Sequence, residues 1–73
     1  MMPEIQLQVN GEDYQIQVES ITILGLLSYL GVSPNGKLVE LNQDHIFRSG
    51  QFDDIYLSSG DRIELIQFMG GGS

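Results

Sequence analysis

Two alternating segments around an Asn-Gly pair open the chain and constrain its fold most strongly. Residues 4–9 (Glu-Ile-Gln-Leu-Gln-Val) and 14–18 (Tyr-Gln-Ile-Gln-Val) alternate along the chain with a period of two, which is typical of a strand with one buried face. The four residues between them begin with Asn10-Gly11, a strong hairpin signal because both residues tolerate positive φ. We therefore predict a β-hairpin with five apolar residues on one face: Ile5, Leu7, Val9, Ile16 and Val18.

A short helix is predicted after the hairpin. Ser20 or Thr22 can cap its amino terminus, and Gly31 can end it in the left-handed conformation, with Val32 folded back on the last turn. Gly25, inside this segment, either weakens the helix or marks a close approach to the sheet. Apolar residues three to four positions apart predict its buried stripe: Ile23, Leu24, Leu27 and Leu30.

The second half of the chain predicts further strands separated by turns. Residues 37–42 form a candidate strand with Val39 and Leu41 on one face, and residues 45–48 a short edge strand. Residues 49–61 are expected to be mostly irregular and to be held against the core by three apolar side chains: Phe52, Ile55 and either Tyr56 or Leu57.

The last predicted strand carries apolar residues on both of its faces. Ile63 and Leu65 are expected to point inward and Glu64 outward, yet further apolar residues fall on the outward face near the end of the strand. One interpretation is an exposed apolar patch that binds a protein partner, formed by Ile66, Phe68 and Met69. The alternative is a central strand that is covered on both faces.

Three glycines and a serine follow this strand: Gly70, Gly71, Gly72 and Ser73. Because glycine lacks a Cβ, such a tail can thread a narrow channel in the active site of a partner. The alternative is a frayed terminus or the remnant of a linker. We expect a folded domain over residues 1–69 and a flexible glycine-rich tail over residues 70–73.

Length and composition limit the classes of function. A chain of 73 residues with 41% apolar residues is expected to fold as one small domain, too short for an enzyme with a substrate cleft of its own. The sequence has no cysteine, which excludes disulfides and thiolate metal sites. Any sulfur chemistry must therefore use something other than a side-chain thiol.

Acidic residues dominate the charge. The chain has ten Asp and Glu residues but only three basic residues, Lys37, Arg48 and Arg62, so its net charge is −7. Nucleic acid and anionic membranes are poor partners for such a chain, and a basic protein surface is a better one. The alternative is that the charge only keeps the protein soluble. No signal peptide or membrane-spanning stretch is recognisable, so we expect a cytoplasmic soluble protein.

Other candidate site residues have simpler explanations. His45 is the only histidine, and a lone histidine offers neither metal-ligand spacing nor a catalytic pair, so we interpret it as a structural or surface residue. Asp53 and Asp54 are interpreted as a solvated turn or cap, because no third ligand is spaced for calcium. We expect no metal site.

The order of the predicted elements, from hairpin to glycine tail, resembles the ubiquitin-like β-grasp fold. Within that fold the chain resembles the ThiS family, the sulfur carriers of thiamin biosynthesis, over nearly its whole length. The resemblance implies an α+β fold with a mixed four- to five-stranded sheet packed on one main helix. It is carried by Asn10-Gly11-Glu12, residues 24–30, Val39-Glu40-Leu41-Asn42 with Arg48 beyond it, residues 59–64 and residues 68–72.

The resemblance implies a carrier whose working group is its own carboxyl terminus. A partner adenylyltransferase of the ThiF type would use ATP and Mg²⁺ to turn the carboxylate of Gly72 into an acyl-adenylate, and a sulfur donor protein would replace AMP by sulfur. The thiocarboxylate would then give its sulfur to a thiazole synthase of the ThiG type. Gly71 and Gly72 match the family diglycine, and Gly70 adds reach. The chain would be a monomeric protein co-substrate that is not an enzyme and binds no cofactor itself.

Ser73 departs from the family pattern, in which the active chain ends on the second glycine. Three explanations are open: Ser73 is trimmed in the cell, it was added during preparation of the protein, or it leaves the chain inactive. With Ser73 retained, we expect no productive transfer of sulfur. Other functions stay open: the small subunit of molybdopterin synthase, a carrier for another sulfur pathway, a ubiquitin-like modifier that forms an amide with lysine, and a passive adaptor.

Overall fold

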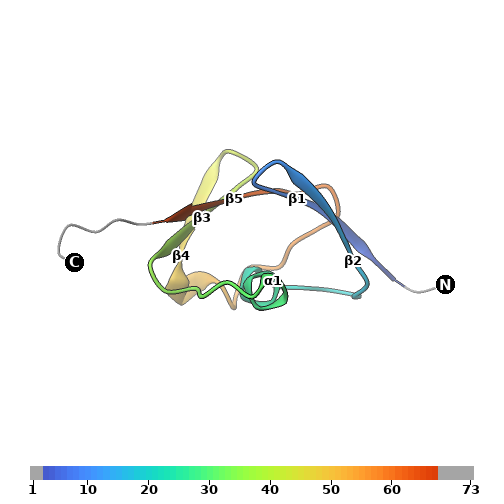
Figure 1. The fold of residues 1–73 in the computed structure, drawn as a ribbon, viewed down its shortest axis with the longest axis horizontal. Helices are drawn as coiled ribbons and strands as arrows, with labels where there is room; N and C mark the ends of the chain where they lie inside the picture. Colours follow the sequence, from blue (N-terminus) through green and yellow to red (C-terminus); the bar gives the residue numbers. More distant parts are fainter. Residues whose placement is uncertain (1–2, 68–73) are drawn as a thin grey trace.

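A mixed sheet covered on one face by a single helix forms the fold (Figure 1). The computed structural model describes residues 3–67. The five strands are β1 (Ile5–Val9), β2 (Glu12–Ile16), β3 (Lys37–Leu41), β4 (His45–Arg48) and β5 (Arg62–Gln67), in the spatial order β2-β1-β5-β3-β4. β1 and β5 are parallel, and the other neighbours are antiparallel. The helix is α1 (Ile23–Leu30), and a 3₁₀ turn, η1, spans Ser49–Gln51. The predicted α+β class is confirmed, with five strands.

The hairpin between β1 and β2 turns on two residues instead of the four that the sequence suggested. Asn10 and Gly11 both have positive φ, 51° and 86°, the backbone twist that a two-residue hairpin turn requires. Val9 therefore pairs directly with Glu12. The predicted second strand over residues 14–18 was wrong in its bounds, because the short turn lets the strand begin two residues earlier.

The predicted apolar face of the hairpin is confirmed for four of its five residues. Val18 lies beyond the end of β2 and is half-buried against the core. Tyr14 occupies the inward position opposite Leu7 and is also half-buried. The buried residues of this face are Ile5, Leu7, Val9 and Ile16.

Both predicted ends of the helix are confirmed. Thr22, rather than Ser20, is the N-cap, because its Oγ1 accepts a hydrogen bond from the Gly25 N–H at 3.0 Å. Gly31 ends the helix at a φ of 72°, and the Val32 N–H folds back to donate to a carbonyl of the last turn at 2.9 Å. These bonds satisfy main-chain groups that a helix end leaves unpaired.

The buried stripe of α1 differs from the prediction at one position. Ile23, Leu26 and Leu27 are completely buried and Leu30 is half-buried, whereas Leu24 is 37% exposed. Leu24 was therefore wrongly assigned to the core and Leu26 was missed. Two stripes fit this leucine-rich segment equally well, and only the rotation of the helix against the sheet selects one of them.

The glycine inside the helix does mark a close approach, although not to the sheet. A Cβ at Gly25 would lie 3.0 Å from the side chain of Ile21, in the segment that enters the helix. That distance leaves no room for a larger residue unless Ile21 moves.

The irregular segment between β4 and β5 supports the start of the helix. Phe52 is completely buried and its carbonyl accepts a hydrogen bond from the Leu24 N–H, while the carbonyl of half-buried Ile55 accepts one from the Ile23 N–H. Leu57 is buried, and Tyr56 is 66% exposed, so Leu57 is the third anchor of this segment. Main-chain groups at the helix start are thereby paired by a distant part of the chain.

The core lies between the helix and the face of the sheet that is turned towards it. We call this the inner face of the sheet and the opposite one the outer face. Val39 and Ile63 from the two central antiparallel strands lie in its middle and are at most 1% exposed. The completely buried side chains are Ile23, Leu26, Leu27, Val39 and Phe52.

Candidate functional site

β5 is the last described element before the predicted glycine tail, which begins at Gly70. It lies in the middle of the sheet, between β1 and β3, and Gln67 is the last described residue. The two patch residues Phe68 and Met69, and the tail residues Gly70, Gly71 and Gly72 with Ser73, lie outside the described residues, so their roles stay predictions. The part of the site that the structure shows is therefore the strand that holds the tail and the surface around its end.

A network of polar side chains fixes the start of β5. The Asn42 N–H donates to the Arg62 carbonyl at 2.8 Å, and the Arg62 N–H donates to Oδ1 of Asn42 at 2.8 Å. Asp61 accepts from Nδ2 of Asn42 at 3.1 Å and from the Ser58 N–H at 2.8 Å. These bonds join the turn before β5 to the end of β3 and set the register of the last strand.

Asn10 of the hairpin turn holds the middle of β5. Its N–H donates to the Ile63 carbonyl at 2.9 Å, and its Oδ1 accepts from the Leu65 N–H at 2.8 Å. The β1–β5 ladder itself reaches only Val9 and Ile63. Asn10 therefore extends the pairing of β5 beyond the end of β1.

The sequence did not reveal these roles of Asn10, Asn42 and Asp61. Asn10 was recognisable as a turn residue and Asp61 as part of a turn before the last strand. Their bonds to other elements, however, join residues 19 or more positions apart in the sequence. Asn42 also has a positive φ (54°), a backbone conformation that the strand-like pattern of residues 37–42 does not reveal.

Ile66 lies on the outer face of the sheet and is 38% exposed. It pairs with Leu38 of β3, and Ile46 of β4, 58% exposed, lies on the same face opposite Glu40. Figure 1 shows the helix on the other face, so the alternative of a last strand covered on both faces is wrong for the described residues. We call Leu38, Ile46 and Ile66 the outer-face patch.

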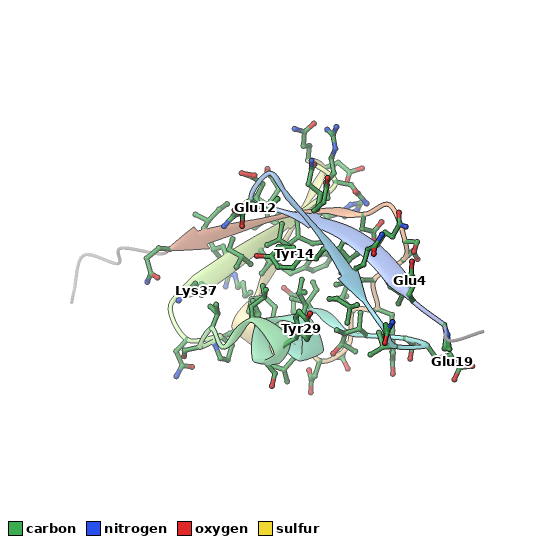
Figure 2. All side chains as sticks on the ribbon, turned by 45° about the vertical axis from the view of Figure 1, so that its right-hand side comes forward. Glu4, Glu12, Tyr14, Glu19, Tyr29 and Lys37 are labelled. Atoms are coloured by element: carbon green, nitrogen blue, oxygen red, sulfur yellow. The ribbon has the colours of Figure 1, made fainter. Side chains whose placement is uncertain are left out.

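Of the three basic residues, Lys37 lies beside the end of β5 and Arg48 lies one strand further away, on β4. Lys37 pairs with Gln67 in the β3–β5 ladder, and Arg48 pairs with Leu38 in the β3–β4 ladder. Figure 2 shows Lys37 at the start of β3, near the point from which the chain leaves the sheet. Lys37 thus places a positive charge near the end of β5, although the chain as a whole is strongly acidic.

Tyr14 forms a polar contact with Glu12 that affects the pKa of the tyrosine. Figure 2 shows Tyr14 on the side of the hairpin that faces the helix. Its hydroxyl donates to Oε1 of Glu12 at 3.2 Å. Partial burial raises the pKa of Tyr14 above its usual value, and the hydrogen bond to Glu12 and the negative charge of that carboxylate raise it further.

The remaining candidates lie on the surface. His45 is exposed on β4, where Nδ1 lies 2.7 Å from Oδ1 of Asp44 and the ring stacks on Phe47. Asp53 and Asp54 are exposed in the segment after η1. Over residues 3–67, no three possible metal ligands come together. Within the same range no helix is long and apolar enough to cross a membrane.

A solved protein structure has the same fold as this chain. The crystal structure of the thiamine biosynthesis protein ThiS from Geobacter metallireducens superimposes with a TM-score of 0.78 at 36% identity, covering 93% of this chain and 100% of that one. This likeness confirms the ubiquitin-like β-grasp fold.

Two longer proteins contain a similar segment. A thiazole synthase of Paramagnetospirillum magneticum is 33% identical over 69 residues, and one of Magnetococcus marinus is 34% identical over 68. The match covers 94% and 93% of this chain but only 21% and 20% of those two proteins, so the chain spans about a fifth of their length.

The family comparison covers nearly the whole chain. The model of the ThiS family matches residues 7–72, a range that includes β5 and Gly70, Gly71 and Gly72 and leaves out Ser73. The match also spans the outer-face patch and the polar residues that hold β5. On this sequence match and on the similarity of fold, the chain belongs to the ThiS family.

Proposed function

We propose that this protein carries sulfur for the formation of the thiazole of thiamin, as a thiocarboxylate on Gly72. The single observation that carries the proposal is the family match, which runs through the last strand and the diglycine to residue 72. The thiamine biosynthesis protein that shares the fold supports the same pathway rather than that of molybdopterin. In this role the chain is a co-substrate of partner enzymes.

The proposed chemistry takes place on the terminal carboxylate. An oxygen of the Gly72 carboxylate attacks the α-phosphorus of ATP on a partner adenylyltransferase, with Mg²⁺ on the phosphates, and pyrophosphate leaves. The terminal sulfur of a persulfide on a donor protein then displaces AMP, and a thiol cleaves the resulting S–S bond to leave the thiocarboxylate. Adenylation is needed because a carboxylate is a poor electrophile without a leaving group.

The fold gives the tail a rigid base. β5 is held on one side by β3 over its whole length and on the other by β1 and Asn10. A strand fixed in this way holds Gln67 in one position relative to the rest of the sheet. Positioning of a reactive group by a rigid element lowers the entropy lost when the group enters an active site.

The outer-face patch is the proposed docking surface for the partners. Exposed Ile46 and Ile66 and half-buried Leu38 lie on three neighbouring strands, near the described end of β5. Apolar side chains at the centre of a surface with a charged rim are typical of protein interfaces. Phe68 and Met69, which follow Gln67 directly, are proposed to complete this surface.

The proposed partners are a thiazole synthase, an adenylyltransferase and a sulfur donor protein. Support for the first comes from the two thiazole synthases that contain a segment like this chain within one polypeptide, because fusion keeps a carrier and its acceptor together. The adenylyltransferase and the donor are required by the chemistry of activation. We place these reactions in the cytoplasm, with the free carrier as a monomer.

The test is the intact mass of the chain isolated from its natural host during growth without thiamin. A species that ends at Gly72 with one oxygen replaced by sulfur is the expected result. A matched pair of chains, one ending at Gly72 and one retaining Ser73, is then incubated with the host adenylyltransferase, ATP, Mg²⁺ and the donor. Only the former should gain sulfur. No sulfur on either chain, with an active adenylyltransferase present, would contradict the proposal.

A further inference from the structure

The main-chain groups of β5 alternate between its two neighbours. The Ile63 carbonyl accepts a hydrogen bond from Asn10, and the Leu65 N–H donates to the same residue, so the odd-numbered residues of β5 face the hairpin. The even-numbered residues face β3, as the Arg62 carbonyl does when it accepts from Asn42. Because this alternation is a property of any strand, the Gln67 N–H and the Leu65 carbonyl also point to the hairpin side.

On that side the pairing stops short of the end of β5. The β1–β5 ladder reaches Ile63, and the side chain of Asn10 adds one bond at Leu65. Within the described part of the chain, no donor reaches the Leu65 carbonyl from that side and the Gln67 N–H has no acceptor there. Figure 1 shows β5 continuing past the turn that joins β1 to β2. The end of β5 thus has an open edge on the hairpin side, in addition to the outer edges of β2 and β4.

We propose that this open edge, the Leu65 carbonyl and the Gln67 N–H, pairs with an extended main-chain segment of the thiazole synthase. The inference rests on the proposed function and adds how the partner recognises the carrier. The partner segment adds to β5 as a short strand, and its main chain continues the hydrogen-bond ladder that Asn10 ends. Strand addition to an exposed sheet edge is a common mode of recognition.

The chemistry of the tail favours main-chain recognition. Gly70, Gly71 and Gly72 have no side chains, so an enzyme that aligns them can bind only their N–H and C=O groups. The five residues from Phe68 to Gly72 span at most about 18 Å when fully extended. An active site that holds Gly72 must therefore bring its entrance close to Gln67, where the same kind of pairing can begin.

The open edge also adjoins the outer-face patch. Ile66, between the two edge groups, belongs to that patch, and its own main chain is paired with β3. A partner strand beside β5 therefore brings its outward side chains next to Ile66. A second copy of this chain is a poorer occupant, because each copy carries a net charge of −7.

A proline at residue 67 lacks the N–H that the open edge offers as a donor. It removes no main-chain hydrogen bond between β5 and β3. Proline has no N–H and is tolerated in a strand where that N–H faces away from the neighbouring strand. Gln67→Pro also loses the bond from Nε2 of Gln67 to the Gly36 carbonyl, at 3.2 Å. Gln67→Ala loses the same side-chain bond and keeps the N–H, so it is the matched control.

The experiment measures the dissociation constant of each variant, ending at Gly72, for the host thiazole synthase by titration calorimetry. We expect Gln67→Pro to bind about five to ten times more weakly than Gln67→Ala, the effect of one main-chain hydrogen bond. The two variants should unfold at the same urea concentration. Equal dissociation constants, within twofold, would overturn the inference. In the complex of the unmodified sequence ending at Gly72, the Gln67 amide should exchange its hydrogen at least tenfold more slowly than in the free chain.

Failure of the inference is distinguishable from failure of the proposed function. If the chain ending at Gly72 gains sulfur and binds the synthase, but both residue-67 variants bind equally, only the open-edge inference is lost. If the chain gains no sulfur and does not bind the synthase, both are lost. If sedimentation shows a dimer of the free chain that Gln67→Pro abolishes, the edge pairs with a second copy and the proposed occupant is wrong.

Discussion

Replacing Asn10 is expected to destabilise the fold by an amount that depends on the substituent. Asn10 has a φ of 51° and its Oδ1 accepts the hydrogen bond from the Leu65 N–H at 2.8 Å. Asn10→Ala loses this bond, worth about 1 kcal/mol, and places a Cβ in the left-handed region, which costs about a further 1.5 kcal/mol. We therefore expect a loss of about 2.5 kcal/mol in the free energy of unfolding.

Two further variants separate the two contributions. Asn10→Gly loses the same bond but has no strain at positive φ, and the added freedom of the unfolded chain costs about 0.5 kcal/mol, so a loss of about 1.5 kcal/mol is expected. Asn10→Asp keeps an acceptor and tolerates the left-handed region. At moderate salt, which screens its charge from Glu12, it should lie within about 0.5 kcal/mol of the wild-type protein.

Urea unfolding followed by far-UV circular dichroism measures these differences. A domain of this length has a free energy of unfolding of roughly 4–11 kcal/mol, so a loss of about 2.5 kcal/mol moves the midpoint clearly. If Asn10→Ala and Asn10→Gly unfold at the same urea concentration, the argument from backbone strain is refuted. If Asn10→Gly is as stable as Asn10→Asp, the bond to Leu65 contributes nothing measurable.

Three further predictions test the core, the shifted titration and the outer-face patch. Leu26→Ala should lower the free energy of unfolding by about 2–5 kcal/mol and Leu24→Ala by less than about 1 kcal/mol, measured by urea unfolding; the reverse order would contradict the observed rotation of the helix. The raised pKa of Tyr14 means that the folded state holds the phenol proton more tightly than the unfolded state and is stabilised by it. This stabilisation is complete below the unfolded pKa of about 10 and is lost as the pH rises through the folded pKa. Glu12→Gln should lower the pKa of Tyr14 in an ultraviolet titration, and an unchanged pKa would exclude Glu12 as a cause. Ile66→Asp should weaken binding to the thiazole synthase about tenfold or more while the chain stays folded, because a charge then occupies the apolar patch; unchanged affinity would place the docking surface elsewhere.

The local pattern was sufficient for most of the secondary structure. Period-two alternation indicated β1, β3 and β5, and the Asn10-Gly11 pair indicated the hairpin turn. Thr22 and Gly31 were recognisable as helix ends because capping depends on residues only a few positions apart. Errors arose where the local signal was degenerate, as between Leu24 and Leu26 and between a two-residue and a four-residue turn.

The site was predictable only in part. The tail chemistry is inferred from the glycines and the resemblance to a family and stays a prediction. Ile66 was expected on an exposed face, where the structure has it. Leu38 and Ile46 were not foreseen as its neighbours, because they come from strands whose pairing is set by the fold. The open edge of β5 could not be foreseen either, since it depends on where β1 ends relative to β5.

By itself, the sequence determined the order of the elements, the residue types on the faces of β1, β3 and β5, and the glycine tail, because each depends on side chains that are near neighbours in the chain. Only the tertiary structure decided the rotation of the helix, the bonds from Asn10 and Asn42 to β5, the patch formed by three strands and the open edge at Leu65 and Gln67. The bonds from Asn42 and Asn10 to β5 join residues 20 and 55 positions apart. Such contacts depend on strand order and register, which result from packing the whole core at once.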